Sequence, residues 1–159
     1  MITAWRIVKS KHQSRAFDGD GARIAGGRWN SPGMPMVYTA QSAALAALEM
    51  LVHLNSGALL SSYVLVPCSF GAGLVLRLDR DRLPEKWRAH PAVPQLQALG
   101  DAWLKNSLSA VLEVPSVIIQ SESNYLLNPR HPEARSIDVG AAQPFDFDAR
   151  LIRSGGPSR

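Results

Sequence analysis

The sequence predicts an α+β domain in which short strands form mixed sheets flanked by helices. Three observations lead to this expectation: short β-branched or alternating runs recur along the chain, two main segments have helical apolar spacing, and long irregular connections separate these elements. The helices do not alternate regularly with strands, which disfavours a doubly wound parallel sheet. At 159 residues the chain fits one domain, because each of two independent cores would be marginal in size.

The N-terminal third contains two strands, a long connection and a helix. Residues 2–8 are rich in β-branched and aromatic side chains, which is typical of a strand, and residues 36–40 form a second short one. Residues 9–35 between them are dense in Gly, Ser, Asp and Arg, and so long a connection in a compact domain is usually functional or mobile. Ser42 then supplies an N-cap hydroxyl for an Ala/Leu-rich helix that is expected to end near residues 56–57.

One acidic residue stands out on this helix. Leu45, Leu48 and Val52 recur at i, i+3 and i+7, which predicts one buried stripe. Glu49 is the only acidic residue between positions 41 and 60, and it falls on the edge of the stripe, about 100° from its centre. Its carboxylate is therefore expected to line a cleft. The alternative is either a partly exposed carboxylate at the helix edge or an ion pair with a nearby arginine.

The rest of the chain predicts further strands and one more helix. In chain order these are strands at 62–67 and 73–78, a solvated charged turn at 79–82, a helical turn at 83–87, a helix at 95–108, a β-branched strand at 114–119, and short strands at 137–139 and 145–148. The chain is expected to be irregular after residue 119, through residue 132, and residues 154–159 are expected to fray.

Charge and cysteine content restrict the class of protein. The 17 Lys and Arg residues exceed the 13 Asp and Glu residues by only four, so the chain favours anionic partners such as nucleotides but lacks the dense basic run of a nucleic-acid arm. The single cysteine, Cys68, lies in an apolar run and is expected to be a buried, inert thiol in a reducing compartment. The first residues lack a charged segment followed by a long apolar one, so a cytoplasmic location is expected. Four dispersed histidines, at 12, 53, 90 and 131, predict no metal site.

The Gly-rich segment 26–33 is the first candidate binding element. Its glycines let backbone N–H groups approach a ligand, and the Arg28 guanidinium can fork onto phosphate or carboxylate oxygens. The alternative is a surface turn with a solvated arginine and a core tryptophan, Trp29. The segment matches neither a phosphate-binding loop nor a dinucleotide fingerprint.

Further polar candidates lie on or near the predicted strands. Tyr38 could stack on a planar ring with its hydroxyl free, or pack as an ordinary strand aromatic. Ser116 is a small hydroxyl in an apolar run, bonded locally or presented to a ligand, and no nucleophile elbow surrounds it. Asn124, Asn128 and His131 could supply amide and imidazole contacts, although Asn-Pro is first of all a turn signal.

Six short segments occur in a fixed order along the chain: Gly26-Gly27-Arg28-Trp29-Asn30, Val37-Tyr38-Thr39-Ala40, Ala47-Leu48-Glu49, Val114-Pro115-Ser116, Asn124-Tyr125-Leu126-Leu127-Asn128-Pro129 and His131-Pro132. The series resembles the RES domain family, which is named for an Arg, a Glu and a Ser. These would be Arg28, Glu49 and Ser116 here. The resemblance runs from residue 5 to about residue 151, which implies a RES domain at 1–152 and a flexible C-terminal tail at 153–159.

The resemblance implies a function. Members of the family are toxins of bacterial type II toxin–antitoxin pairs, their fold is similar to that of ADP-ribosyltransferase toxins, and they deplete NAD⁺ and so arrest growth. It implies a cognate Xre-type helix-turn-helix antitoxin as partner, with room for a homodimer within the complex, and no direct contact with nucleic acid or membrane. NAD⁺ would be a substrate, cleaved at its nicotinamide–ribose bond by a glycohydrolase or phosphorylase, with no metal or other cofactor.

The resemblance also assigns residues. Glu49 would stabilise the oxocarbenium-like ribose, and Arg28 would hold the pyrophosphate. Tyr38 would stack on the nicotinamide, and Ser116 would form a hydrogen bond with the ribose or the amide. Trp29, Asn124 and Asn128 complete the implied substrate-binding set.

Three other activities remain open from the sequence. One is an ADP-ribosyltransferase that modifies a macromolecule. Another is a basic module that binds nucleic acid through Arg15, Arg23, Arg28 and Trp29. The last is a metal-free nuclease in which Glu122 and His131 serve as acid and base.

Overall fold

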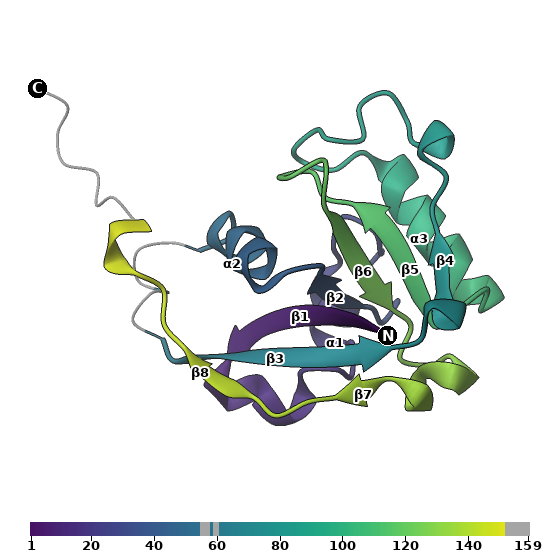
Figure 1. Ribbon diagram of the computed structural model, residues 1–159. Helices are drawn as coiled ribbons and strands as arrows, with labels where there is room; N and C mark the ends of the chain where they lie inside the picture. Colours follow the sequence, from purple (N-terminus) through teal and green to yellow (C-terminus); the bar gives the residue numbers. More distant parts are fainter. Residues whose placement is uncertain (55–57, 59–60, 152–159) are drawn as a thin grey trace, which may run out of the picture.

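One curled sheet organises the chain in the computed structural model, which describes residues 1–54, 58 and 61–151 (Figure 1). Within those residues the sheet has eight strands, in the order β4-β5-β6-β2-β1-β3-β7, with β8 also paired to β3. Only β4 and β5 pair in parallel; the other neighbours are antiparallel. The strands are β1 Ile2–Lys9, β2 Val37–Ala40, β3 Tyr63–Phe70, β4 Val75–Arg77, β5 Val111–Pro115, β6 Ser123–Leu127, β7 Asp138–Val139 and β8 Gln143–Phe145.

Three α-helices and several 3-10 turns accompany the sheet, which confirms the predicted α+β class. The helices are α1 Asp20–Ala25, α2 Ala43–Leu51 and α3 Pro94–Asn106, and the 3-10 turns are η1 Ser10–Arg15, η3 Ala72–Leu74, η4 Arg80–Arg82, η5 Pro132–Ser136 and η6 Ala149–Leu151. The Ser42 hydroxyl accepts the Leu45 N–H at 3.1 Å, so the predicted N-cap of α2 is confirmed. None of the helices in the described part of the chain has the length and hydropathy to span a membrane.

Several expected elements differ from the observed ones. The long segment before residue 36 contains η1 and α1, and residues 83–87 form turns without a helix. Residues 123–127, expected to be irregular, form β6. Successive residues of this strand are buried on opposite faces of the sheet, so its sequence has no alternation of apolar and polar residues. The strand expected at 114–119 ends at Pro115. There the Ser116 hydroxyl accepts hydrogen bonds from the N–H groups of Ile118 and Ile119, and the chain turns. The predicted end of the second helix and the frayed tail fall outside the described residues.

The predicted buried stripe of α2 is wrong in part. Leu45 and Ala46 are buried, whereas Leu48 is 36% exposed and Val52 is 62% exposed. The side of the helix that carries Leu45, Ala46 and Met50 packs against β1 and β2. The helix is therefore rotated about its axis from the orientation that the leucine spacing favours. Glu49 is next to this packed side and faces the sheet.

Both larger helices cover the same face of the sheet. The side chains of α3 pack on Leu112 and Leu126, and those of α2 pack on Ala40. Tyr38 pairs with Leu126 across β2 and β6, so these two and Ala40 point to one face. Asn124 pairs with Ala40, which places its amide on this face as well. A strip of β2 and β6 between the two helices is therefore where polar side chains can gather (Figure 1).

Candidate active site

The Glu49 carboxylate is held by side chains from two other parts of the chain. Its Oε1 accepts hydrogen bonds from Ser116 Oγ at 3.0 Å and from Asn124 Nδ2 at 2.7 Å. Its Oε2 accepts none from any described residue. Hydrogen bonds to a carboxylate are among the stronger ones in proteins, so one oxygen of Glu49 is fixed and the other is left to act on a ligand.

Ser116 acts as a hydrogen-bond donor in this arrangement. It is completely buried at the end of β5, and its Oγ accepts the N–H groups of Ile118 at 3.1 Å and Ile119 at 3.2 Å. With its acceptor capacity taken by two amides, the hydroxyl directs its single proton to Glu49. Ser116 therefore orients the carboxylate, and its burial does not agree with a direct contact with substrate.

Asn124 provides the second donor from β6. Its Oδ1 is buried and has no hydrogen-bond partner among the described residues. Rotating the amide would bring two acceptor oxygens together at Glu49, so the observed orientation is the favourable one. The bond to the carboxylate thus leaves the amide oxygen of Asn124 buried and unpaired, which is unfavourable. We infer that Asn124 is oriented by its bond to Glu49.

Arg28 lies within electrostatic reach of Glu49. Its Nη1 donates to the carbonyl oxygens of Trp87 at 3.2 Å and Ala89 at 2.9 Å. Partial burial lowers the pKa of the Arg28 guanidinium, and the negative charge of Glu49 opposes this shift. The guanidinium stays protonated at neutral pH, and its Nε and Nη2 bind no described residue, so they remain available to an anion.

Tyr38 ties the loop that carries Arg28 to β2. We call residues 26–33 the Arg28 loop. The Tyr38 hydroxyl accepts the Trp29 N–H at 3.0 Å and donates to Asn30 Oδ1 at 2.7 Å, so it is not free as expected. Burial raises the pKa of Tyr38, and its partly buried side chain packs against the core cluster that includes Trp29 and Leu126. A Cβ at Gly27 would lie 2.6 Å from the hydroxyl oxygen, which explains the glycine.

Two predicted ligand-contacting residues lie elsewhere. Trp29 is 3% exposed and packs in the core with Leu96 and Trp103 of α3. Asn128 is 1% exposed and directly follows the last residue of β6, four residues beyond Asn124 and about 13 Å away at the rise of a strand. The structure therefore brings together Glu49, Ser116, Asn124, Arg28 and Tyr38, but neither Trp29 nor Asn128 is presented at that point.

Sequence reasoning missed the side of α3 that faces the Arg28 loop. Gln97 Nε2 donates to the carbonyls of Gly27 at 2.9 Å and Asn30 at 3.2 Å, and Asp101 Oδ1 accepts the Ser31 N–H at 2.9 Å. The available signal was a glutamine and an aspartate four residues apart on an otherwise amphipathic helix, which share one face.

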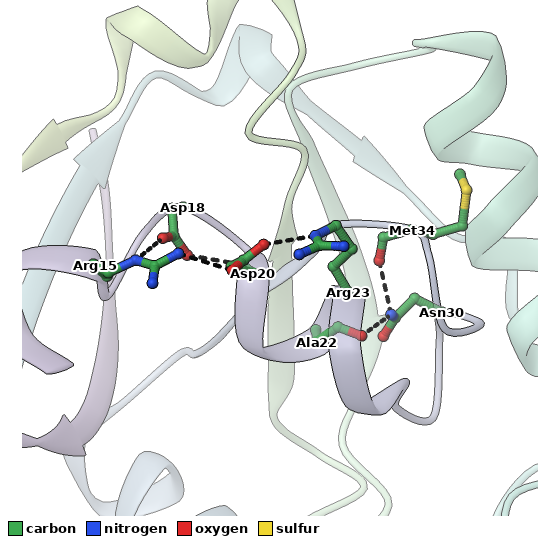
Figure 2. Close-up of polar contacts among 7 residues, drawn as sticks. All are labelled: Arg15, Asp18, Asp20, Ala22, Arg23, Asn30 and Met34. Atoms are coloured by element: carbon green, nitrogen blue, oxygen red, sulfur yellow. Dashed lines mark hydrogen bonds and ion pairs between the residues drawn. The ribbon is translucent and has the colours of Figure 1, made fainter.

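Two of the three arginines that suggested a nucleic-acid module, Arg15 and Arg23, are paired with carboxylates. Arg15 contacts Asp18 at 2.9 Å and Asp20 at 2.8 Å, and Arg23 contacts Asp20 at 2.6 Å (Figure 2). Figure 2 also shows the buried Asn30 amide donating to the carbonyls of Ala22 and Met34, so this corner has a structural role.

The pair suggested for a nuclease is separated. Glu122 precedes β6 and accepts the Ser42 hydroxyl at 3.1 Å, whereas His131 follows β6 and caps η5. An acid and a base at opposite ends of one strand cannot act on the same bond.

Comparisons with known proteins identify the family and the fold. The model of the RES domain family matches residues 3–148. The "Prs ADP-ribosylating toxin" of Sphingobium sp. (strain YBL2) is 41% identical over 155 residues, covering 94% of this chain and 96% of the relative. A protein named "Toxin Res" from Yersinia enterocolitica is 36% identical over 149 residues, covering 92% and 97%. In the crystal structure of the M. tuberculosis MbcT–MbcA toxin–antitoxin complex, one chain has a similar fold, with a TM-score of 0.72 at 20% identity, covering 91% of this chain and 84% of that one.

Proposed function

The chain belongs to the RES domain family and is a toxin of that family, and from this premise we propose that it consumes NAD⁺ by breaking the bond between nicotinamide and ribose. One observation carries the proposal: the Glu49 carboxylate has one oxygen fixed by Ser116 and Asn124 and the other free, with the Arg28 guanidinium in electrostatic reach.

The chemistry requires little more than a placed carboxylate. As the C–N glycosidic bond breaks, its electron pair goes to the pyridinium nitrogen and nicotinamide leaves as a neutral molecule without protonation. Positive charge develops at the ribose carbon and its ring oxygen, where the free oxygen of Glu49 stabilises it. An acceptor then attacks this carbon from the open side and loses its proton to solvent or to the carboxylate.

The other residues bind and orient. Arg28 directs its free guanidinium donors to the pyrophosphate, for which a planar fork fits better than an ammonium group. The Tyr38 ring provides a surface for the nicotinamide. Ser116 and Asn124 keep Glu49 in one rotamer through the reaction and do not touch the substrate, which revises the direct contact expected of Ser116.

Two acceptor classes are consistent with the site. Water or inorganic phosphate makes the chain an NAD⁺ glycohydrolase or phosphorylase. ADP-ribosyl transfer to a macromolecule is the second candidate, because the relative that is 41% identical is named an ADP-ribosylating toxin. Both share the cleavage step at Glu49.

A protein partner follows from the same comparisons. The chain of similar fold comes from a toxin–antitoxin complex, so we propose that this chain is also held inactive by an antitoxin, of the Xre type that the sequence suggests. A cytoplasmic location fits a toxin whose substrate is a cytoplasmic dinucleotide.

The test incubates the purified chain with NAD⁺, with and without phosphate, and identifies the products by chromatography and mass spectrometry. Nicotinamide with ADP-ribose indicates hydrolysis, and nicotinamide with ADP-ribose 1″-phosphate indicates phosphorolysis. Glu49→Gln should abolish both reactions, whereas Glu85→Gln, at an exposed carboxylate, should not. Transfer would appear as a mass gain on an acceptor in cell extract. NAD⁺ left intact in every condition would overturn the proposal.

A further inference from the structure

The Arg28 loop cannot satisfy its own backbone groups. Within the loop, the Gly27 N–H donates to the Asn30 carbonyl at 2.9 Å; just beyond its end, the Met34 N–H donates to the Ser31 carbonyl at 3.1 Å. Three further backbone groups point toward α3: the Gly27 carbonyl, the Asn30 carbonyl through its second lone pair, and the Ser31 N–H. Backbone groups removed from water need partners, so the shape of this loop depends on what lies against it.

Two side chains of α3 supply those partners. The Gln97 amide donates to both carbonyls, on either side of Arg28, and Asp101 accepts the Ser31 N–H. Gln97 and Asp101 are one helical turn apart and point the same way. The loop is therefore held by three hydrogen bonds to one rigid element, the helix α3.

Gly100 allows α3 to approach the loop closely enough for these hydrogen bonds. A Cβ at this position would lie 1.7 Å from the Trp29 carbonyl oxygen, so the helix backbone and the loop backbone touch directly. At that separation Gln97, about one turn before Gly100, and Asp101, the next residue, both reach the loop. The helix itself is fixed by Leu96 and Trp103, which are buried against β5 and β6.

The consequence concerns Arg28, which neither Gln97 nor Asp101 touches. Its guanidinium is partly desolvated and rests on two carbonyls of a different loop, so small shifts of its own backbone would release it. We propose that Gln97 and Asp101 are positioning residues that set the affinity for the dinucleotide by holding Arg28 in place; this inference rests on the proposed function. Preorganisation of a binding group improves affinity because its ordering cost is met before the ligand arrives.

The test compares Gln97→Leu with Gln95→Leu, an exposed position on the same helix without a hydrogen bond to any described residue. Gln97→Leu should raise the KM for NAD⁺ about tenfold and leave kcat within about twofold, because pyrophosphate binding is equal in the ground and transition states. Gln95→Leu should change neither constant. A Gln97→Leu variant with a lower melting temperature and an unchanged KM would show a merely structural role and overturn the inference.

A second arm needs no turnover. The Ser31 amide should exchange its hydrogen at least about tenfold faster in Asp101→Leu, whereas Asp101→Asn, which keeps the acceptor oxygen, should retain protection and the wild-type KM. If the wild type leaves NAD⁺ intact, the proposed function fails, and this arm still decides whether α3 holds the loop. Unchanged Ser31 exchange in Asp101→Leu would overturn the inference even in an active enzyme.

Discussion

Gly100→Ala separates two opposing effects at the contact between α3 and the Arg28 loop. Alanine favours a helix interior over glycine by about 1 kcal/mol, so the substitution would stabilise an exposed helix. Here the new Cβ would meet the Trp29 carbonyl oxygen at 1.7 Å and the carbonyl carbon at 2.8 Å. The loop or the helix has to withdraw by more than about 1 Å, which overpacking studies associate with a cost of about 1–3 kcal/mol.

The withdrawal also breaks hydrogen bonds. Gln97 and Asp101 hold the loop by three bonds of 2.9–3.2 Å, and each net bond contributes about 1 kcal/mol. Together the costs exceed the gain in helix propensity, and we expect a net loss of about 2–4 kcal/mol in the free energy of unfolding. For a chain of this size that corresponds to a melting temperature about 5–15 °C lower.

Thermal and urea unfolding followed by circular dichroism measure the effect. Gly73→Ala is the matched control, because a Cβ at Gly73 would find no atom within 4 Å, and it should stay within about 0.5 kcal/mol of the wild type. The expected activity change is a raised KM. A Gly100→Ala variant at least as stable as the wild type would refute the reasoning, since the helix would then be able to withdraw at no cost.

Three further predictions follow from single side chains. Ser116→Ala removes a donor to Glu49 and leaves two backbone N–H groups unpaired, so kcat should fall at least about tenfold and the free energy of unfolding by about 2–3 kcal/mol. In the same turnover and unfolding assays, Ser121→Ala, at an exposed position, should change neither quantity. Tyr38→Phe leaves a backbone N–H and an amide oxygen of the Arg28 loop unpaired and should cost about 1–3 kcal/mol in urea unfolding; no loss would mean that the hydroxyl does not hold the loop. Burial raises the pKa of the Cys68 thiol to about 12, so the unfolded chain releases this proton first and stability should fall as pH rises from about 9 toward 12; Cys68→Ala should flatten that slope, and an equal slope would contradict the assignment.

Local elements of the fold were predictable where one residue type decides them. Ser42 could be recognised as an N-cap because a hydroxyl preceding an Ala/Leu run has that role, and Cys68 could be predicted to be buried from its apolar surroundings. The rotation of α2 was not predictable, because helical spacing marks a set of apolar positions but not the side that the sheet accepts. Leu48 and Val52 fit the pattern and are exposed.

The candidate site shows a similar division. Arg28, Glu49 and Ser116 could be selected from the sequence through a family resemblance, but not the bond of Ser116 to Glu49, which joins residues 67 positions apart. The role of Asn124 required the register of β6 against β2, and β6 itself was not expected. The spacing of Gln97 and Asp101 places them on one helix face, but it does not show that this face meets backbone groups of a loop 70 positions away.

The N-terminal end of α2 is anchored to the start of β6, the strand that carries Asn124. The Gln41 N–H donates to the Ser123 carbonyl at 3.0 Å, and the Gln41 side chain accepts the Ser123 N–H at 2.9 Å, so the start of α2 is fixed to the start of β6. The Ser42 hydroxyl caps the helix and donates to Glu122, which fixes the same junction a second time. From this anchored end, a helix of 1.5 Å rise per residue carries Glu49 about 10 Å along its axis. The Glu49 side chain then reaches back to Asn124 near the start of β6, so the bond between carboxylate and amide joins the helix and the strand once more.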